Sequence, residues 1–153
     1  MSVSIRLATR DDVPAVLCLY AACGIDPPAD AQQVAAASLH WDRLAAAGAR
    51  VFLAEHEGQV LGTLTLYVLP LLAHGLAPEA LVEDVAVDAA AQGQGVGRAL
   101  MHHAMGVARG HGCYKLALSS NIRREAAHAF YDSLGFERHG ISFVVPLQQE
   151  PLQ

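Results

Sequence analysis

Apolar residues recur at two spacings along this chain, and each spacing predicts a different kind of element. Alternation and short apolar runs predict strands at 3–8, 50–55, 59–69, 80–87 and 113–118. Helical spacing predicts a first helix that begins at Thr9 and is broken by 23–28, and further helices at 29–47, 95–110 and 123–134. Two last strands are expected at 137–139 and 141–146, which gives the order βααβββαβαββ.

This order predicts an α/β (α+β) fold in which one mixed, mostly antiparallel sheet of six to seven strands carries helices on both faces. The strands at 50–55 and 59–69 flank His56-Glu57-Gly58, a sequence typical of a hairpin turn. Because the chain has 153 residues and neither a linker nor a repeat, we expect a single domain over 1–153.

Composition narrows the classes of partner. Apolar residues make up 53 % of the chain, but the longest uninterrupted apolar run, 68–73, is far shorter than the roughly 20 residues of a membrane span. The N-terminus lacks the apolar core of a signal peptide, so we expect a cytoplasmic protein without a membrane partner. A net charge of −5 without basic runs argues against nucleic acid and fits a cationic small molecule. Neither H-E-x-x-H nor C-x-x-C occurs, so no metal is expected.

The most informative stretch is 81–100, LVEDVAVDAAAQGQGVGRAL, in which an apolar strand runs into a glycine-rich turn and then into a helix. Gly93, Gly95 and Gly97 allow backbone conformations that a Cβ atom disfavours. The amides of such a turn, with the unpaired N–H groups that begin the helix, suit a pyrophosphate. Arg98, in the first turn of that helix, is expected to reach the same phosphates.

Spacing excludes two common nucleotide loops. A dinucleotide fingerprint starting at Gly93 needs glycine where the chain has Arg98, and one starting at Gly95 needs glycine where it has Leu100. A P-loop needs lysine after its last glycine, but Arg98 follows Gly97. A plain tight turn is the alternative interpretation of these glycines.

The remaining pattern, Gln92-x-x-Gly95-x-Gly97 after a strand, resembles the coenzyme A loop of the GCN5-related N-acetyltransferases (GNAT). Two further segments match that family in the same order, EDVAV at 83–87 and FYDSLGF at 130–136. The resemblance implies that acetyl-CoA is the co-substrate and that the strands at 80–87 and 113–118 splay apart at a bulge. The implied cofactor-binding residues are Val85, Ala86, Val87, Gln92, Gly93, Gln94, Gly95, Val96, Gly97, Arg98 and Asn121. For Asn121, a helix cap is the alternative.

The resemblance implies an N-acetyltransferase that acts on a primary amine of a small molecule by direct attack in a ternary complex. Segments 82–87, 92–95 and 112–116 are also similar to glucosamine-6-phosphate N-acetyltransferases, whereas 118–130 differs from them. An amino-sugar phosphate is therefore the alternative acceptor. The alternative of another class is a module that binds coenzyme A or a protein partner without turnover. The family also implies a homodimer.

Two side chains fit the proton transfers of this reaction. An amine with a pKa near 10.4 is only about 0.1 % neutral or less at pH 7, so a base is needed. We expect Glu83 to be that base, directly or through water, because alternation places it on the face of Val85 and Val87 and turns Asp84 the other way. The Val85 N–H is expected to bind the oxyanion.

Tyr131 matches the family's tyrosine that gives a proton to the departing thiolate. The alternatives are a salt bridge or a substrate anchor for Glu83 and a packing role for Tyr131. The acceptor pocket is expected to use 25–41, 67–76 and 141–144. Its polar or aromatic candidates are His40, Trp41, Tyr67 and His74.

Overall fold

The computed structural model describes residues 1–147, which contain five strands and four α-helices. The strands are β1 (Ser4–Leu7), β2 (Ala49–His56), β3 (Gln59–Leu69), β4 (Glu79–Val87) and β5 (Lys115–Ala117). The α-helices are α1 (Val13–Ala22), α2 (Ala31–Ala46), α3 (Val96–Gly110) and α4 (Glu125–Ser133). Three short 3₁₀ helices are η1 (Arg10–Asp12), η2 (His74–Leu76) and η3 (Ala89–Ala91). The chain divides into two compact units, 1–118 and 119–153, so the single domain stays a prediction.

The five strands form one sheet in the order β1-β2-β3-β4-β5. The first four are antiparallel neighbours, and β5 runs parallel to β4, so the expected mixed, mostly antiparallel sheet is confirmed. The ladder between β4 and β5 has only three residue pairs and ends where Leu81 meets Ala117. Beyond Leu81, no strand within residues 1–147 pairs with that side of β4.

The expectation of six to seven strands is wrong for the residues that the structure describes. Segments 137–139 and 141–146 form no strand, and Ile141, Phe143 and Val144 are 81 %, 91 % and 86 % exposed. Alternation predicts a strand only where a neighbour completes the ladder and covers the apolar face. The described part of unit 119–153 contains no other strand that could do so.

Most predicted helix boundaries lie within two residues of the observed ones. The start at Thr9 is the exception, because its capping box with Asp12 begins the short helix η1, and the α-helix begins only at Val13. At α2, the Asp30 carboxylate accepts from the Gln33 N–H at 2.8 Å, while Asp30 N–H donates to the Gln33 amide oxygen at 2.9 Å. None of the helices within 1–147 is long and apolar enough to cross a membrane.

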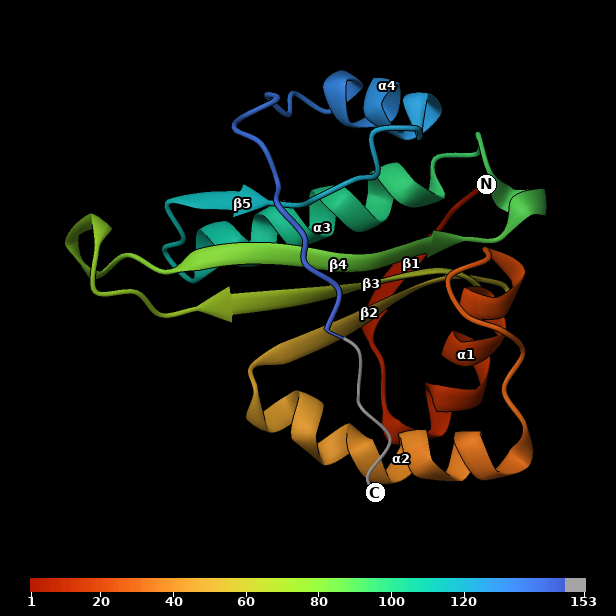
Figure 1. Ribbon diagram of the computed structural model, residues 1–153. Helices are drawn as coiled ribbons and strands as arrows, with labels where there is room; N and C mark the ends of the chain where they lie inside the picture. The colour runs from red at the N-terminus through yellow and green to blue at the C-terminus, as the bar shows by residue number, and fades with distance from the viewer. Residues whose placement is uncertain (148–153) are drawn as a thin grey trace. The chain divides into compact units, whose positions relative to one another are not determined.

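Within residues 1–118, helices cover both faces of the sheet, as predicted. Figure 1 shows α3 over one face and α1 and α2 over the other. Val51 and Leu53 of β2 form a buried cluster with Val16 of α1. Trp41 and Tyr20 pack against this cluster. The alternate residue Phe52 points the opposite way and meets the ring of His103 on α3 at a centroid distance of 4.7 Å.

Gly62 of β3 allows the N-terminal turns of α3 to approach the sheet closely. A Cβ atom there would lie 2.9 Å from Val96 Cγ1, 3.1 Å from Leu100 Cδ1 and 3.2 Å from the Ala86 carbonyl oxygen. Val96 and Leu100 are buried on α3, so there is little room for them to yield. A glycine in a strand interior is typical of such close approach.

We predict that Gly62→Ala lowers the free energy of unfolding by about 1 to 3 kcal/mol, because the added methyl overpacks the contact between β3 and α3. Urea unfolding followed by circular dichroism measures this. Gly106→Ala is the matched control, since a Cβ there meets nothing within 4 Å and alanine favours helix, so a gain of about 0.5 to 1 kcal/mol is expected. Equal stability of Gly62→Ala and wild type would contradict the packing argument.

Candidate active site

A bulge interrupts β4 at Asp84, in agreement with the resemblance. On β3, Thr65 pairs with Glu83 and Thr63 pairs with Ala86, so one residue of β3 faces two of β4, Asp84 and Val85. Asp84 has a φ of 53°, in the left-handed region that aspartate tolerates better than most residues. The bulge therefore depends on an aspartate in an uncommon backbone conformation.

The bulge changes which side chains share a face of the sheet. Glu83 pairs with Thr65 and Val87 pairs with Gly62, and these two partners are three residues apart on β3. Directly paired residues point to the same face, so Glu83 and Val87 lie on opposite faces. The prediction that alternation puts them together is wrong, because the extra residue shifts the alternation. Glu83 lies on the face covered by α1 and α2, together with Thr65.

The second half of β4 presents an open edge. Because the β4–β5 ladder ends at Leu81, the segment that contains Val85, Ala86 and Val87 has β3 on one side and no strand of the described chain on the other. The Val87 carbonyl accepts two long contacts of 3.4 Å, from the Cys23 thiol and from the Gln92 side-chain amide. Such an edge offers backbone N–H and C=O groups to an extended ligand.

The glycine-rich turn follows this strand directly. The Asp88 carboxylate accepts from the Ala90 N–H at 2.8 Å and caps η3, and the Gln94 side chain donates to the Ala90 carbonyl at 2.8 Å. Gly93 and Gly95 have φ values of 75° and 88°, and Gly95 is the N-cap of α3. The prediction that glycines here adopt conformations that a Cβ disfavours is therefore confirmed for Gly93 and Gly95 and wrong for Gly97, which lies within α3.

The turn has the donors that a pyrophosphate requires. Within residues 1–147, no backbone hydrogen bond uses the N–H of Gly93 or Gly95. The N–H groups of Val96 and Gly97 lie in the first turn of α3, where an α-helix supplies no acceptor. Gln92, Gly93, Gln94, Gly95 and Arg98 are all solvent-exposed. These residues fit the phosphates of a nucleotide cofactor, which the positive end of α3 also favours.

Acidic and phenolic side chains interact with one another near Glu83. Asp84 acts electrostatically on Glu83, Asp26 acts on Asp84, and both aspartates act on the phenol of Tyr20 from α1. Burial raises the pKa of Glu83, and the charge of Asp84 raises it further. Burial and Asp26 raise the pKa of Asp84 in the same way. Burial, then Asp84, raise the pKa of Tyr20 to about 12, so its phenol stays protonated at neutral pH.

Tyr131 and Asn121 belong to unit 119–153. Tyr131 lies on α4 with its ring edge-on to Phe136 at 5.7 Å, and burial raises its pKa while Arg124 lowers it. Its carbonyl accepts the N–H of Phe136 at 3.1 Å at the end of the helix. The Asn121 side-chain oxygen accepts the Arg123 N–H at 2.9 Å in the turn before α4. The N-cap of α4 is Arg124 and has no side-chain cap hydrogen bond, so the alternative of a helix cap is wrong. The cofactor role of Asn121 stays a prediction.

Sequence reasoning missed Tyr20 and Thr65, and it included Asp26 only as part of the range 25–41 expected in the acceptor pocket. Tyr20 and Thr65 have the spacing of ordinary core residues, and Asp26 lies in the segment that breaks the first helix. Among the predicted pocket candidates, Trp41 packs against the core and His74 stacks on Tyr114 at 4.1 Å. No sequence signal distinguishes the missed residues, because they meet only where α1 packs on β3 and β4 in the folded protein.

Comparisons with known proteins agree with this geometry. The family model described as "Acetyltransferase (GNAT) family" matches residues 13–136. Glucosamine 6-phosphate N-acetyltransferase of Trypanosoma brucei brucei is 34 % identical over 90 residues, 59 % of this chain and 59 % of that protein. The 5-NmdU N-acetyltransferase of Pseudomonas phage PaMx11 is 36 % identical over 92 residues, 60 % of each chain. The matched segments thus cover about three fifths of these curated relatives.

A solved structure covers far more of the chain. A protein of Agrobacterium tumefaciens str. C58, described as an acetyltransferase on a provisional basis, has a TM-score of 0.86 and 33 % identity. It is matched over 94 % of this chain and 99 % of its own length. The resemblance seen in the loop, the strand before it and the later tyrosine segment is confirmed, and the chain belongs to the acetyltransferase (GNAT) family.

Proposed function

We propose that this protein is an acetyl-CoA-dependent N-acetyltransferase that acylates a primary amine of a small molecule by direct attack in a ternary complex. The observation that carries the proposal is the bulged strand β4, whose open edge runs directly into the turn of Gly93 and Gly95. Family membership supports acetyl-CoA as the co-substrate. Cytoplasmic location and a homodimer stay predictions from the sequence.

The chain offers separate groups for the two ends of the cofactor. The N–H groups of Gly93, Gly95 and Val96 would bind the pyrophosphate at the N-terminus of α3. The open edge of Val85–Val87 would bond the pantetheine arm. Acetyl-CoA, when bound, supplies the acetyl group as an activated thioester.

The proton transfers then fall to three groups of this chain. Glu83 accepts a proton from the acceptor ammonium, directly or through water, so that the amine becomes nucleophilic. The Val85 N–H donates to the carbonyl oxygen as negative charge develops there. Tyr131 gives its proton to the departing sulfur as the new C–N bond replaces the C–S bond, and it regains a proton from solvent. The nitrogen loses its second proton to solvent as the amide forms, and Glu83 releases the proton that it accepted, so one proton is released per turnover. The products are an amide and the free thiol of coenzyme A.

A thiol-release assay with acetyl-CoA and a panel of primary amines tests the proposal, and calorimetry measures acetyl-CoA binding alongside it. We expect saturable turnover with at least one amine. Acetyl-CoA binding without turnover by any acceptor, in both wild type and Tyr131→Phe, would instead indicate a non-catalytic module. Glucosamine-6-phosphate belongs in the panel, because a relative at 34 % identity carries that substrate in its name.

A further inference from the structure

Three hydrogen bonds hold Asn121 in place before α4. Its side-chain oxygen accepts the Arg123 N–H at 2.9 Å, and its backbone carbonyl accepts the Arg124 N–H at 3.0 Å. The third partner is His128 of α4, whose Nε2 lies 2.9 Å from the same carbonyl oxygen. A carbonyl oxygen can only accept, so the His128 ring carries a proton on Nε2 and donates it. The His128 side chain therefore fixes a residue seven positions earlier in the chain.

The bond from His128 is not one that stability requires. Asn121 is exposed, so water can serve its carbonyl, and the Arg124 N–H already binds that oxygen. The bond does not cap α4 either, because the N–H groups of a helix start need acceptors and His128 supplies a donor. A redundant bond on an exposed loop contributes little free energy. Its main effect is on the direction in which Asn121 points.

Asn121 keeps one polar group of its side chain available for a ligand. Its oxygen is used by the Arg123 N–H, whereas its amide nitrogen, with two N–H donors, forms no hydrogen bond within residues 1–147. The pantetheine arm of coenzyme A carries amide carbonyls, which accept from such donors. Tyr131, the proposed acid, follows His128 by one helical turn on the same face of α4. The bond thus ties the loop of Asn121 to the helix of Tyr131.

We propose that His128 is a positioning residue for the cofactor, which orients the Asn121 amide nitrogen toward an amide carbonyl of the pantetheine arm. This inference rests on the proposed acetyl transfer and on the predicted cofactor role of Asn121. His128 itself touches neither the cofactor nor the reacting atoms. Its hydrogen bond holds the Asn121 backbone, and the bond from Arg123 holds the side chain, so the two N–H donors keep one direction.

The test removes the donor of His128 and then restores it. His128→Phe keeps a ring of similar size but cannot donate. KM and the calorimetric Kd for acetyl-CoA should therefore rise about three- to tenfold, the net contribution of one hydrogen bond. His128→Gln should restore most of the affinity, because the glutamine amide nitrogen donates from nearly the position of histidine Nε2. Urea unfolding should place both variants close to wild type, since the bond is redundant for stability.

A double-mutant cycle separates positioning from a structural role. Asn121→Ala keeps the backbone carbonyl that His128 binds but removes the two amide donors, so it should itself raise Kd for acetyl-CoA about three- to tenfold. Because His128 acts through those donors, adding His128→Phe to Asn121→Ala should raise Kd by less than about a further twofold. A structural role of His128 would instead add its full loss in both backgrounds.

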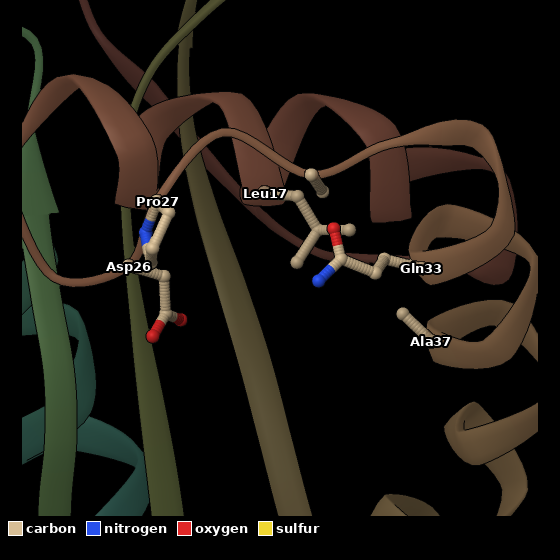
Figure 2. Close-up of a pocket in the computed structure, with 6 residues that line it drawn as sticks. Leu17, Asp26, Pro27, Gln33 and Ala37 are labelled. Carbon is tan, nitrogen blue, oxygen red and sulfur yellow. The ribbon is translucent and has the colours of Figure 1, made fainter.

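The acceptor provides an internal control. A pocket of about 180 Å³ lies between α1 and α2, and its lining belongs wholly to residues 1–118: Leu17, Asp26, Pro27, Ala29, Gln33 and Ala37. Figure 2 shows Leu17 and Gln33 pointing toward each other, with Asp26 on the opposite side from Ala37. All but Leu17 lie in the range 25–41 expected in the acceptor pocket. With acetyl-CoA saturating, KM for the amine should therefore stay unchanged in His128→Phe.

His139→Phe is the matched variant, because His139 is an exposed histidine of the same unit outside α4, and KM for acetyl-CoA should not change. An affinity loss that glutamine does not restore, or that persists in full beside Asn121→Ala, would overturn the inference and leave acetyl transfer intact. So would equal affinity of His128→Phe and wild type. Absence of turnover with every amine would overturn the proposed function, while Kd for acetyl-CoA would still decide the role of His128. A wild-type protein that does not bind acetyl-CoA would overturn both.

Discussion

Replacement of Glu83 by glutamine is expected to lower kcat/KM for amine acetylation by about 10²- to 10³-fold at pH 7, the usual contribution of a general base. The acceptor amine is almost fully protonated at this pH, and only an ionised carboxylate can remove its proton. Glutamine keeps the size of the side chain and its place beside Thr65 on the bulged strand, but it cannot accept that proton. A steady-state thiol-release assay with the best amine measures the loss.

The pH profile separates a base from a mere substrate anchor. Burial and Asp84 raise the pKa of Glu83, so wild type should lose activity as pH falls through a value higher than that of an ordinary glutamate. Below that pKa the carboxyl is protonated, and kcat/KM of wild type should fall tenfold per pH unit, whereas above it kcat/KM should stay nearly flat while the amine is an ammonium. Glu83→Gln should depend on free amine, so its kcat/KM should rise with pH across the whole neutral range. The same profile in both proteins would assign Glu83 to binding only.

Glu79→Gln is the matched control for this substitution. Glu79 begins the same strand, and its carboxylate lies 3.7 Å from the Lys115 ammonium in a partly exposed pair. Such pairs contribute about 0 to 1 kcal/mol, so neither activity nor fold should change much. Glu83→Gln should not destabilise the protein either. A carboxyl whose pKa is raised by folding contributes less stability as pH rises through that pKa, so neutral glutamine removes an unfavourable charge.

Tyr131→Phe is expected to lower kcat by about 10- to 100-fold at pH 7 while leaving acetyl-CoA binding within about twofold, because it removes a proton donor and keeps the ring. The effect lies at the low end of acid catalysis since a thiol with a pKa near 8.5 can also depart as a thiolate. The ring contact with Phe136 persists in phenylalanine, so α4 should keep its packing. Single-turnover kinetics with acetyl-CoA in excess measure the chemical step.

The loss of kcat in Tyr131→Phe should become smaller as pH rises. Burial raises the pKa of Tyr131, so the phenol remains a proton donor throughout the neutral range. As pH rises above about 8.5, the free thiolate becomes the stable form and the deficit of Tyr131→Phe should shrink. Tyr114→Phe serves as the control, because it removes a phenol whose ring stacks on His74 and its change should leave kcat unaltered. A deficit that stays constant from pH 7 to 9.5 would contradict the donor role.

The cofactor side of the site could be predicted because its signal is local. The spacing of Gly93 and Gly95 before an amphipathic helix determines a turn and a helix start within a few residues, and the structure places both as expected. Gln92 and Gln94 are also exposed in that turn. Such short-range features depend little on the rest of the fold.

The acceptor side could not be predicted because it depends on contacts between distant segments. Asp26, Thr65 and Asp84 all act on Tyr20 of α1, which requires α1 to pack on β3 and β4. The bulge then puts Glu83 and Val87 on opposite faces, where alternation had put them together. The strand expected at 141–146 fails for a related reason. Its apolar alternation indicates strand propensity, but pairing requires a neighbour that the sequence pattern does not identify.

Asp84 combines two properties that few substitutions preserve together. Its backbone angle of 53° is accessible to glycine, asparagine and aspartate far more readily than to branched residues, and its carboxylate contributes to the charge beside Glu83. Glycine would keep the bend and remove the charge, whereas glutamate would keep the charge in a backbone region that it enters less readily. A single substitution of Asp84 would therefore change either the geometry of the bulged strand or the negative charge beside Glu83.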